Sequence, residues 1–326
     1  MRRREFIAGL GGAAAWPMMA RAQQSPTPVI GFLSNQTENL GAPTAAAVRQ
    51  GLGEQGFVEG RNVEILYRWT DQQTDRSAAE DLVRRRVSVV ITPGGGTAPA
   101  LAAKAATAAI PIVFAVGSDP VEIGLVASLN RPGGNVTGST RLVQELTAKH
   151  LELLHGIVPA ATSIGFLVDP RVPYAVAQLR EAETAADLLG VRLVILKASS
   201  PGEIETVFGS LVERQIGALL VGAGVLFFGS QRDQLTSLAA RRKIPAIYPF
   251  HEFTAAGGLM SYGTNYHEAD RLAGIYAGRI LKGEKPADLP VQRPTNIKMV
   301  LNLKAAEALG LTVPQSILLR ADEVIE

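Results

Sequence analysis

The sequence contains no cysteine among its 326 residues. This absence excludes disulfide bonds, thiolate metal ligands, cysteine nucleophiles and a lipid-modified cysteine behind an export signal. Long apolar runs are also missing, because no segment reaches the roughly 20 consecutive apolar residues that a membrane-spanning helix requires. We therefore expect a chain without a membrane anchor or stable membrane insertion.

Residues 1–22 have the layout of an export signal. Three arginines open the segment, a weakly apolar Gly/Ala stretch follows, and Ala20-Arg21-Ala22 offers small residues for cleavage. Arg3-Arg4 before Phe6-Ile7 resembles the bacterial twin-arginine signal, which exports folded proteins; an arginine-rich secretory signal is the alternative. Both signals predict a soluble periplasmic protein.

Once this segment is removed, the remaining chain has no excess of positive charge. The loss of four arginines and one glutamate changes the formal net charge from +2 to −1. No basic field then remains to attract a phosphate backbone, so nucleic acid is not an expected partner. About 300 residues are left, more than one hydrophobic core usually serves, and we therefore expect two domains.

A regular alternation of patterns runs along the rest of the chain. Short β-branched or apolar runs alternate with longer helical patterns, which is typical of βαβ units on a parallel sheet. The alternation predicts two similar α/β halves in tandem. Strands are expected at residues 29–33, 63–67, 87–92 and 112–116, and again at residues 164–168, 192–197, 218–221 and 246–248.

The C-terminal part departs from this order. It predicts a strand at residues 259–262, a helix at 267–281 and a strand at 297–302. Such a tail is explained if the chain crosses back between the halves, so that three strands form a hinge beside a cleft. We place residues 28–141 and 263–291 in the first lobe and residues 142–262 and 292–326 in the second.

Ligands of an open parallel sheet bind beyond the carboxyl ends of its strands, where loops lead into helices. Glycine and small polar residues dominate the segments that follow the predicted strands. These segments are residues 34–36, 93–97, 117–120, 169–170, 222–224 and 249–252, with residues 262–266 added by the crossing tail.

Each of these features has two interpretations. The bare backbone of residues 93–97 could direct N–H groups at a ligand carboxylate, or the glycines could serve only a tight turn with positive φ. Asp119 could bind a ligand ammonium or cap a turn before Pro120. Five aromatic residues could wall a pocket or simply pack: Tyr174, Phe227, Phe228, Tyr262 and Tyr266.

Enzyme signatures are absent from the sequence. It has no G-x-S-x-G, H-E-x-x-H or G-x-x-x-x-G-K-[ST] motif. His150 and His155 are five residues apart, which does not match the i,i+4 spacing of helical metal ligands. Gly222-Ala223-Gly224 matches half of a dinucleotide fingerprint, but Phe227 stands where its third glycine is required. We expect no catalytic residue, no metal and no cofactor.

Four stretches carry a more specific pattern. Residues 117–121 read Gly-Ser-Asp-Pro-Val and residues 132–138 read Pro-Gly-Gly-Asn-Val-Thr-Gly. Residues 280–286 read Ile-Leu-Lys-Gly-Glu-Lys-Pro, and residues 321–325 read Ala-Asp-Glu-Val-Ile. These stretches resemble the family of ABC-transporter substrate-binding proteins that includes the tryptophan and tyrosine binders, and the resemblance spans nearly the whole chain after the signal.

The resemblance implies a type I periplasmic binding fold, in which two Rossmann-like α/β lobes joined by three crossovers close on a ligand. Carried over by position, it implies these ligand-binding residues: Ser34, Asn35, Gln36, Thr92, Gly94, Gly95, Gly96, Thr97, Ser118, Asp119, Gly222, Ala223, Gly224, Tyr262, Thr264, Asn265 and Tyr266.

Two departures from the family bear on the ligand. The amino-acid binders resemble Thr-Pro-Ala-Ala-Gln where this chain has Thr92-Pro93-Gly94-Gly95-Gly96. They are also richer in Thr, Asp and Asn where this chain has Gly222-Ala223-Gly224-Val225. Both changes remove side-chain hydrogen-bonding groups, which argues against an aromatic amino acid as the ligand.

The expected function is that of a monomeric periplasmic receptor of an ABC importer. It would capture a small polar or zwitterionic, amino-acid-like solute and deliver it to a permease with its ATPase. A ligand-sensing partner of a membrane sensor kinase is the alternative, and an exported α/β enzyme is a third.

Overall fold

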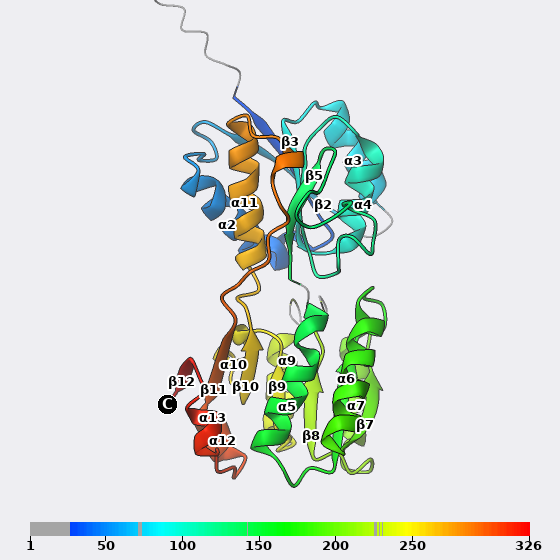
Figure 1. Cartoon of the computed structure of the whole chain (residues 1–326), viewed down its shortest axis with the longest axis vertical. Helices are drawn as coiled ribbons and strands as arrows, with labels where there is room; N and C mark the ends of the chain where they lie inside the picture. The colour runs from blue at the N-terminus through cyan, green and yellow to red at the C-terminus, as the bar shows by residue number, and fades with distance from the viewer. Residues whose placement is uncertain (1–26, 71–73, 142, 225–226, 228, 230) are drawn as a thin grey trace, which may run out of the picture.

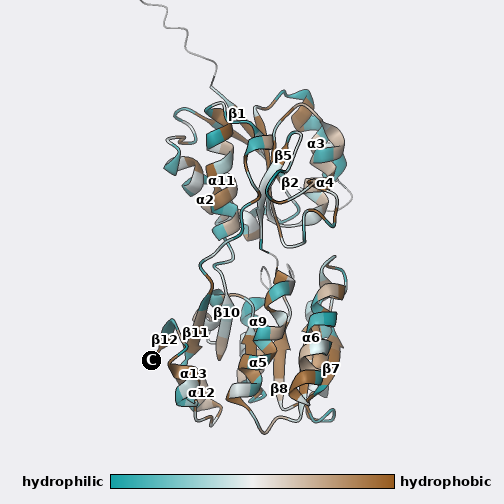
Figure 2. Cartoon of the chain, in the orientation of Figure 1, coloured by the Kyte–Doolittle hydropathy of each residue, from teal (hydrophilic) through white to brown (hydrophobic). Residues whose placement is uncertain are grey.

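The computed structural model describes residues 27–70, 74–141, 143–224, 227, 229 and 231–326. The export signal predicted at residues 1–22 and the aromatic residue Phe228 lie outside this part of the chain. Two lobes follow each other along the long axis of the molecule (Figure 1). Hydrophobic residues are concentrated in the strands, whereas the helices alternate hydrophobic and hydrophilic stretches (Figure 2).

The first lobe is built on a five-stranded parallel sheet with the order β2-β1-β3-β4-β5. Its strands are β1 (Val29–Ser34), β2 (Glu64–Trp69), β3 (Val89–Gly95), β4 (Ile112–Val116) and β5 (Val136–Thr140). The helices α2 (Glu38–Glu54) and α11 (Glu268–Leu281) cover one face, and α3 (Asp75–Arg84) and α4 (Thr97–Ala106) cover the other.

Helix α11 comes from the C-terminal part of the chain and packs closely against α2. The backbones approach at two glycines: a Cβ added to Gly51 would lie 2.0 Å from the Arg271 carbonyl oxygen, and one added to Gly274 would lie 2.2 Å from that of Val48. Figure 1 shows the two helices side by side in the first lobe. The tail therefore completes the core of the first lobe.

The second lobe contains a seven-stranded sheet with the order β12-β11-β10-β9-β8-β6-β7. All its neighbouring strands are parallel except β10 and β11. The strands are β6 (Ser163–Val168), β7 (Arg192–Lys197), β8 (Ala218–Val221), β9 (Ala246–Tyr248), β10 (Met260–Gly263), β11 (Lys298–Asn302) and β12 (Glu323–Ile325).

Helices cover both faces of this second sheet, and a hydrophobic core lies on each side of it. The helices are α5 (Thr147–Ile157), α6 (Ala175–Leu189), α7 (Pro201–Ser210), α9 (Arg232–Arg241), α10 (His251–Ala255), α12 (Leu303–Ala308) and α13 (Gln315–Leu318). Two 3-10 turns, η1 (Val143–Leu146) and η2 (Pro286–Asp288), are also present. Within the described ranges, no helix has the length and apolar character needed to cross a membrane.

The chain passes between the lobes three times: from β5 to η1, from β10 to α11, and from η2 to β11. The third crossover runs beside the first, because Gln292 exchanges backbone hydrogen bonds with Gly138 and Thr140. The predicted fold class, two α/β lobes with parallel sheets joined by a three-strand hinge, is confirmed. The residue boundaries given for the lobes stay a prediction.

Some elements differ from the sequence-based expectation. The helical pattern after the first strand predicts a helix over residues 44–55, but α2 already begins at Glu38, where the Thr37 side chain caps it by accepting a hydrogen bond from Leu40 N–H; Pro43 lies inside the helix. Strand β3 continues to Gly95, three residues beyond its predicted end. Strand β5 and helix α5 were not predicted.

Candidate functional site

A pocket of about 320 Å³ lies between the two lobes. Its walls come from the loops that follow β1, β3 and β6, which are the carboxyl ends of parallel strands. The first lobe contributes Asn35, Gly95, Gly96, Thr97 and Ala98, and the second contributes Asp169, Arg171, Val172, Pro173 and Tyr174. Four of the predicted ligand-binding residues therefore line this interlobe cleft.

The glycine-rich turn forms the floor of the cleft in the first lobe. Gly94 and Gly95 have φ of +87° and +81°, a region that favours glycine. The Gly94 N–H donates to Asp270 Oδ1 at 2.8 Å, and the Gly94 carbonyl accepts from the Tyr266 hydroxyl at 2.8 Å. Because the Gly94 N–H already donates to Asp270, it is not free to bind a ligand.

An anion could instead meet the start of α4. Gly96 is the N-cap residue of this helix and has no side chain to cap its first turn. Thr97 and Ala98 both line the cleft, and a helix N-terminus favours negative charge. The backbone role predicted for residues 93–97 is therefore best placed at the beginning of α4.

Four neutral polar side chains surround the glycine turn. A Cβ on Gly94 would lie 3.1 Å from Gln36 Oε1 and 3.3 Å from Ser34 Oγ, and a Cβ on Gly96 would lie 2.6 Å from Asn35 Oδ1. These atoms and the Thr92 hydroxyl are buried and have no hydrogen-bond partner within the described part of the chain. Because unpaired buried polar groups are rare, this cluster is suited to polar ligand atoms.

Ser118 and Asp119, at the end of β4, take part in local structure. The hydroxyls of Ser118 and Thr97 lie 3.1 Å apart, so these two predicted residues are brought together. The Asp119 carboxylate accepts hydrogen bonds from the N–H groups of Val121 and Glu122 at 2.7 and 3.3 Å. Its contacts are those of a turn cap, and it does not line the cleft.

The second lobe presents an ion pair to the cleft. Arg171 donates to Asp169 through two nitrogens, Nη2 to Oδ2 at 2.7 Å and Nε to Oδ1 at 2.9 Å. The Asp169 side chain is 2% exposed, whereas that of Arg171 is 55% exposed. The hydrogen bonds to Asp169 raise the pKa of Arg171, so this arginine stays charged at the mouth of the cleft.

Gly222, Ala223 and Gly224 lie behind Asp169 rather than on the cleft wall. A Cβ on Gly222 would lie 3.0 Å from the Leu167 carbonyl oxygen, and one on Gly224 would lie 3.6 Å from Asp169 Cβ. Ala223 belongs to the core of the second lobe. The glycine at 222 therefore permits close packing against β6, which gives a structural reason for the partial dinucleotide pattern.

The lobes touch at Tyr174. A Cβ on Gly117 of the first lobe would lie only 2.8 Å from Tyr174 Cε1, so a side chain at residue 117 would collide with the ring. Tyr174 lines the cleft, and burial raises the pKa of its hydroxyl. Phe227, in contrast, is fully buried in the core of the second lobe.

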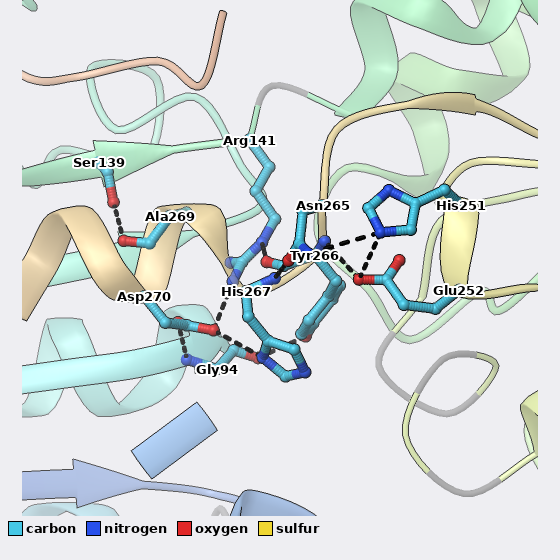
Figure 3. Close-up of polar contacts among 10 residues, drawn as sticks. All are labelled: Gly94, Ser139, Arg141, His251, Glu252, Asn265, Tyr266, His267, Ala269 and Asp270. Carbon is cyan, nitrogen blue, oxygen red and sulfur yellow. Dashed lines mark hydrogen bonds and ion pairs between the residues drawn. The ribbon is translucent and has the colours of Figure 1, made fainter. Parts of the chain in front are cut away.

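The hinge contains a buried cluster around Arg141, Tyr266 and Asp270 (Figure 3). Arg141 Nη2 lies 3.0 Å from Asp270 Oδ2, Arg141 Nε donates to the Tyr266 carbonyl at 2.9 Å, and the guanidinium lies 4.3 Å from the Tyr266 ring centre. Burial, the largest single effect, would lower the pKa of Arg141, but the charge and hydrogen bond of Asp270 together with the nearby Tyr266 and Tyr174 outweigh it, and the pKa is raised. Burial raises the pKa of Tyr266 to about 12.

The other predicted residues of the second crossover hold the crossover itself. Asn265 Oδ1 accepts from His267 N–H at 2.8 Å, and its Nδ2 lies 3.4 Å from His251 Nε2 (Figure 3). Tyr262 is part of β10, and Thr264 is buried beside it. Of the four, only Tyr266 reaches the glycine turn.

Sequence reasoning missed Arg141, Arg171 and Asp270. Arg141 is the first residue after β5, so recognition of that strand would have placed it at a carboxyl end. No group of three or more potential metal ligands occurs in the portion of the chain that the structure covers.

The chain is similar to proteins that bind amino acids. A tyrosine-binding protein of Clostridioides difficile (strain R20291) is 28% identical over 277 residues, which cover 83% of this chain and 79% of that protein. An ABC domain from Streptococcus pneumonia, solved in complex with L-Trp, is 26% identical with a TM-score of 0.78 and covers 92% of this chain and 100% of its own.

A third relative was solved without a ligand. The ligand-free, open structure of a substrate binding protein with adhesive properties from Clostridium difficile is 27% identical, covers 91% of this chain and 99% of its own, and has a TM-score of 0.67. At nearly equal identity and coverage, the chain as a whole therefore superposes better on the L-Trp complex than on this open structure.

Family membership follows from the match of nearly the whole described chain. The family model for ABC transporter substrate binding proteins matches residues 35–325. The chain belongs to the family of ABC transporter substrate binding proteins.

Proposed function

We propose that this protein is the periplasmic receptor of an ABC importer, which captures a small polar or zwitterionic solute between its lobes and delivers it to a permease with its ATPase. The observation that carries this proposal is the cluster of buried, unpaired polar atoms at the glycine turn. It borders a cleft whose opposite wall presents Asp169 and Arg171. The protein acts by binding, as a monomer, and not as an enzyme.

The charges of the cleft suit an amino-acid-like solute. The start of α4 favours a carboxylate, and the buried Asp169 carboxylate favours an ammonium group. The relatives named for tyrosine and solved with L-Trp support this ligand class. The glycines of the turn and of residues 222–224 would leave fewer side-chain hydrogen bonds for that solute than the amino-acid binders offer.

Capture would work by a shift of population between open and closed arrangements. A solute that contacts both walls binds the closed form better, and it can shift the equilibrium only by that difference in affinity. Tyr174 against Gly117 shows how the lobes meet when they are close. The closed form is the one that we propose is presented to the permease.

Export is part of the proposal, and it rests on the arginine-rich segment at residues 1–22. The twin-arginine route would deliver the protein already folded to the periplasm. Cell fractionation tests this route: replacing Arg3-Arg4 by Lys-Lys should leave the precursor in the cytoplasm, whereas a secretory signal would still export it.

Thermal unfolding in the presence of candidate solutes tests the binding role. The panel is the twenty common L-amino acids, other carboxylates, purines and sugars. A solute at about 100 times its Kd should add roughly 2.7 kcal/mol to the free energy of unfolding. If no solute raises the melting temperature, the receptor role is contradicted; if one does but its cellular uptake is unchanged without the gene, delivery to a permease is contradicted.

A further inference from the structure

Arg141 has an unusual position for a structural arginine. It is the first residue after β5, on the first crossover, and its side chain is only 2% exposed. Its partner Asp270 is fully buried and lies 129 residues further along the chain, in the first turn of α11. The pair therefore joins the first crossover to the helix that follows the second.

Asp270 is shared between this guanidinium and the glycine turn. Its Oδ1 accepts from the Gly94 N–H at 2.8 Å, and its Oδ2 accepts from Arg141 Nη2 at 3.0 Å. The His267 ring nitrogen Nδ1 lies a further 3.4 Å from Oδ2 (Figure 3). The Asp270 carboxylate therefore binds both the glycine turn, at Gly94 N–H, and one edge of the Arg141 guanidinium, at Nη2.

The other edge of the guanidinium is unsatisfied. Arg141 Nε donates to the Tyr266 carbonyl and Nη2 donates to Asp270, but Nη1 is buried without a hydrogen-bond partner in the described chain. A buried ion pair is stabilising only when its remaining donors are also satisfied, so an arginine serving only the fold should not leave Nη1 unpaired. The free edge points to a ligand.

The surroundings of Nη1 identify where that ligand would be. A Cβ on Gly95 would lie 3.1 Å from Nη1, and Gly95 lines the interlobe cleft. Tyr174, from the opposite wall, is close enough for the Arg141 charge to lower the pKa of its hydroxyl against the larger, raising effect of burial. Arg141 itself does not line the cleft, but its Nη1 lies directly behind Gly95, which does.

We propose that Arg141 is a ligand-contact residue whose Nη1 donates to a carboxylate oxygen of the bound solute, while Asp270 and the Tyr266 carbonyl hold the guanidinium in place. This inference rests on the proposed receptor function and names the ligand class as carboxylates, α-amino acids included. A charge-assisted hydrogen bond is about twice as strong as a neutral one, so the site would prefer a carboxylate to its amide.

The charge balance of the cleft agrees with this class. Arg141 with Asp270 and Arg171 with Asp169 are two neutral pairs, so an added zwitterion leaves no net charge buried. The start of α4 supplies further positive potential beside Gly95. A carboxylate at Nη1 would be attracted by the Arg141 guanidinium and by the N-terminus of α4.

The test compares binding of each of the twenty common L-amino acids and its C-terminal amide by titration calorimetry. Arg141→Met combined with Asp270→Asn removes both charges together, and the new amide oxygen can still accept from Gly94 N–H. The tightest-binding amino acid should bind roughly 10- to 100-fold more weakly to this double variant, and its amide should bind the wild type more weakly by a similar factor.

A matched control uses another ion pair of α11. Arg279 pairs with Glu284 at 2.6 Å and lies over the Tyr276 ring, away from the cleft. Arg279→Met with Glu284→Gln should bind the amino acid like the wild type. If the Arg141 double variant does not fold, Arg141→Lys takes its place, because it keeps the charge but loses the planar edge and should still weaken binding.

Three outcomes would overturn the inference. Binding of the amino acid within threefold of the wild type, by the double variant or by the lysine variant when that takes its place, would show that Arg141 does not contact it. Equal affinity for acid and amide would exclude a carboxylate contact. Binding of sugars or purines alone would contradict the Arg141 inference and leave the receptor role intact, whereas binding of nothing in the panel would contradict both.

Discussion

Each charged side chain at the cleft is paired within the protein, whereas several neutral ones are not. Asp169 is held by Arg171, and Asp270 by Arg141 and Gly94. The Ser34, Asn35, Gln36 and Thr92 side-chain oxygens lack partners within the described residues. Because these pairs are already neutral, a zwitterion would be favoured over a solute with a net charge. Its carboxylate would meet the start of α4 and the free edge of Arg141, its ammonium group would meet Asp169, and its other polar atoms would meet the neutral groups.

His150 gives a prediction about pH. Its ring is buried, its Nε2 contacts the Tyr262 carbonyl and must carry the proton, and burial lowers its pKa to about 4. In the unfolded chain the pKa is about 6.5, so the unfolded state binds more protons between these values and stability falls as the pH drops. The His150 contribution is fully present above the unfolded pKa.

Urea unfolding at pH 7 and pH 5 measures this effect. From this residue alone, the free energy of unfolding should decrease by about 2 kcal/mol between the two pH values. His150→Gln, which cannot take up a proton, should remove most of that decrease. An unchanged pH dependence in the variant would show that other groups cause it.

At the scale of elements, the packing of α2 on α11 depends on particular glycines. Gly51 and Gly53 lie in the same helix, but a Cβ on Gly51 would lie 2.0 Å from the Arg271 carbonyl, whereas one on Gly53 would meet nothing within 4 Å. Gly51→Ala should therefore force the helices apart and lower the free energy of unfolding by about 2 kcal/mol or more.

Gly53→Ala is the matched control for this packing. It should raise the free energy of unfolding by up to about 1 kcal/mol, because alanine favours a helix over glycine. Urea unfolding of both variants distinguishes the effects. Equal stability of the two variants would contradict the close helix contact.

Most strands could be predicted because strands buried on both faces of a parallel sheet are short apolar runs. Strand β5 is different: Val136 is its only large apolar residue, yet all five of its residues are buried. The hydroxyls of Thr137, Ser139 and Thr140 donate to the carbonyls of Leu289, Ala269 and Ser118. These partners come from distant parts of the sequence, so a local pattern cannot show that the strand tolerates polar residues.

The same missing strand explains the gap in the predicted site. Because β5 was not recognised, Arg141 was not seen to stand at a carboxyl end. Asn35, Gly95, Gly96 and Thr97 were named because they follow strands with clear apolar runs, and the structure places them on the cleft wall. Asp270 lies inside a helix start, and only its tertiary contacts with Gly94 and Arg141 draw attention to it.

At the scale of the whole molecule, the cleft depends on a chain that changes lobe three times. The third crossover pairs with β5, and the second carries Tyr266, whose hydroxyl holds the glycine turn. The turn that lines the cleft is therefore tied to the hinge by direct contacts. Movement of the hinge and occupation of the cleft would influence each other through these bonds, which is the behaviour expected of a receptor that closes on its solute.

Titration calorimetry of a variant with a blocked cleft tests the central claim most directly. Ala98 lines the cleft in the first turn of α4, and Leu101 lies on the same helix with 40% exposure and does not line it. The account predicts that the wild type and Leu101→Phe bind one molecule of the best L-amino acid with equal affinity, whereas Ala98→Phe remains folded and loses at least about tenfold in affinity, corresponding to 1.4 kcal/mol. Undiminished binding by Ala98→Phe would show that the solute is captured elsewhere and would contradict the account.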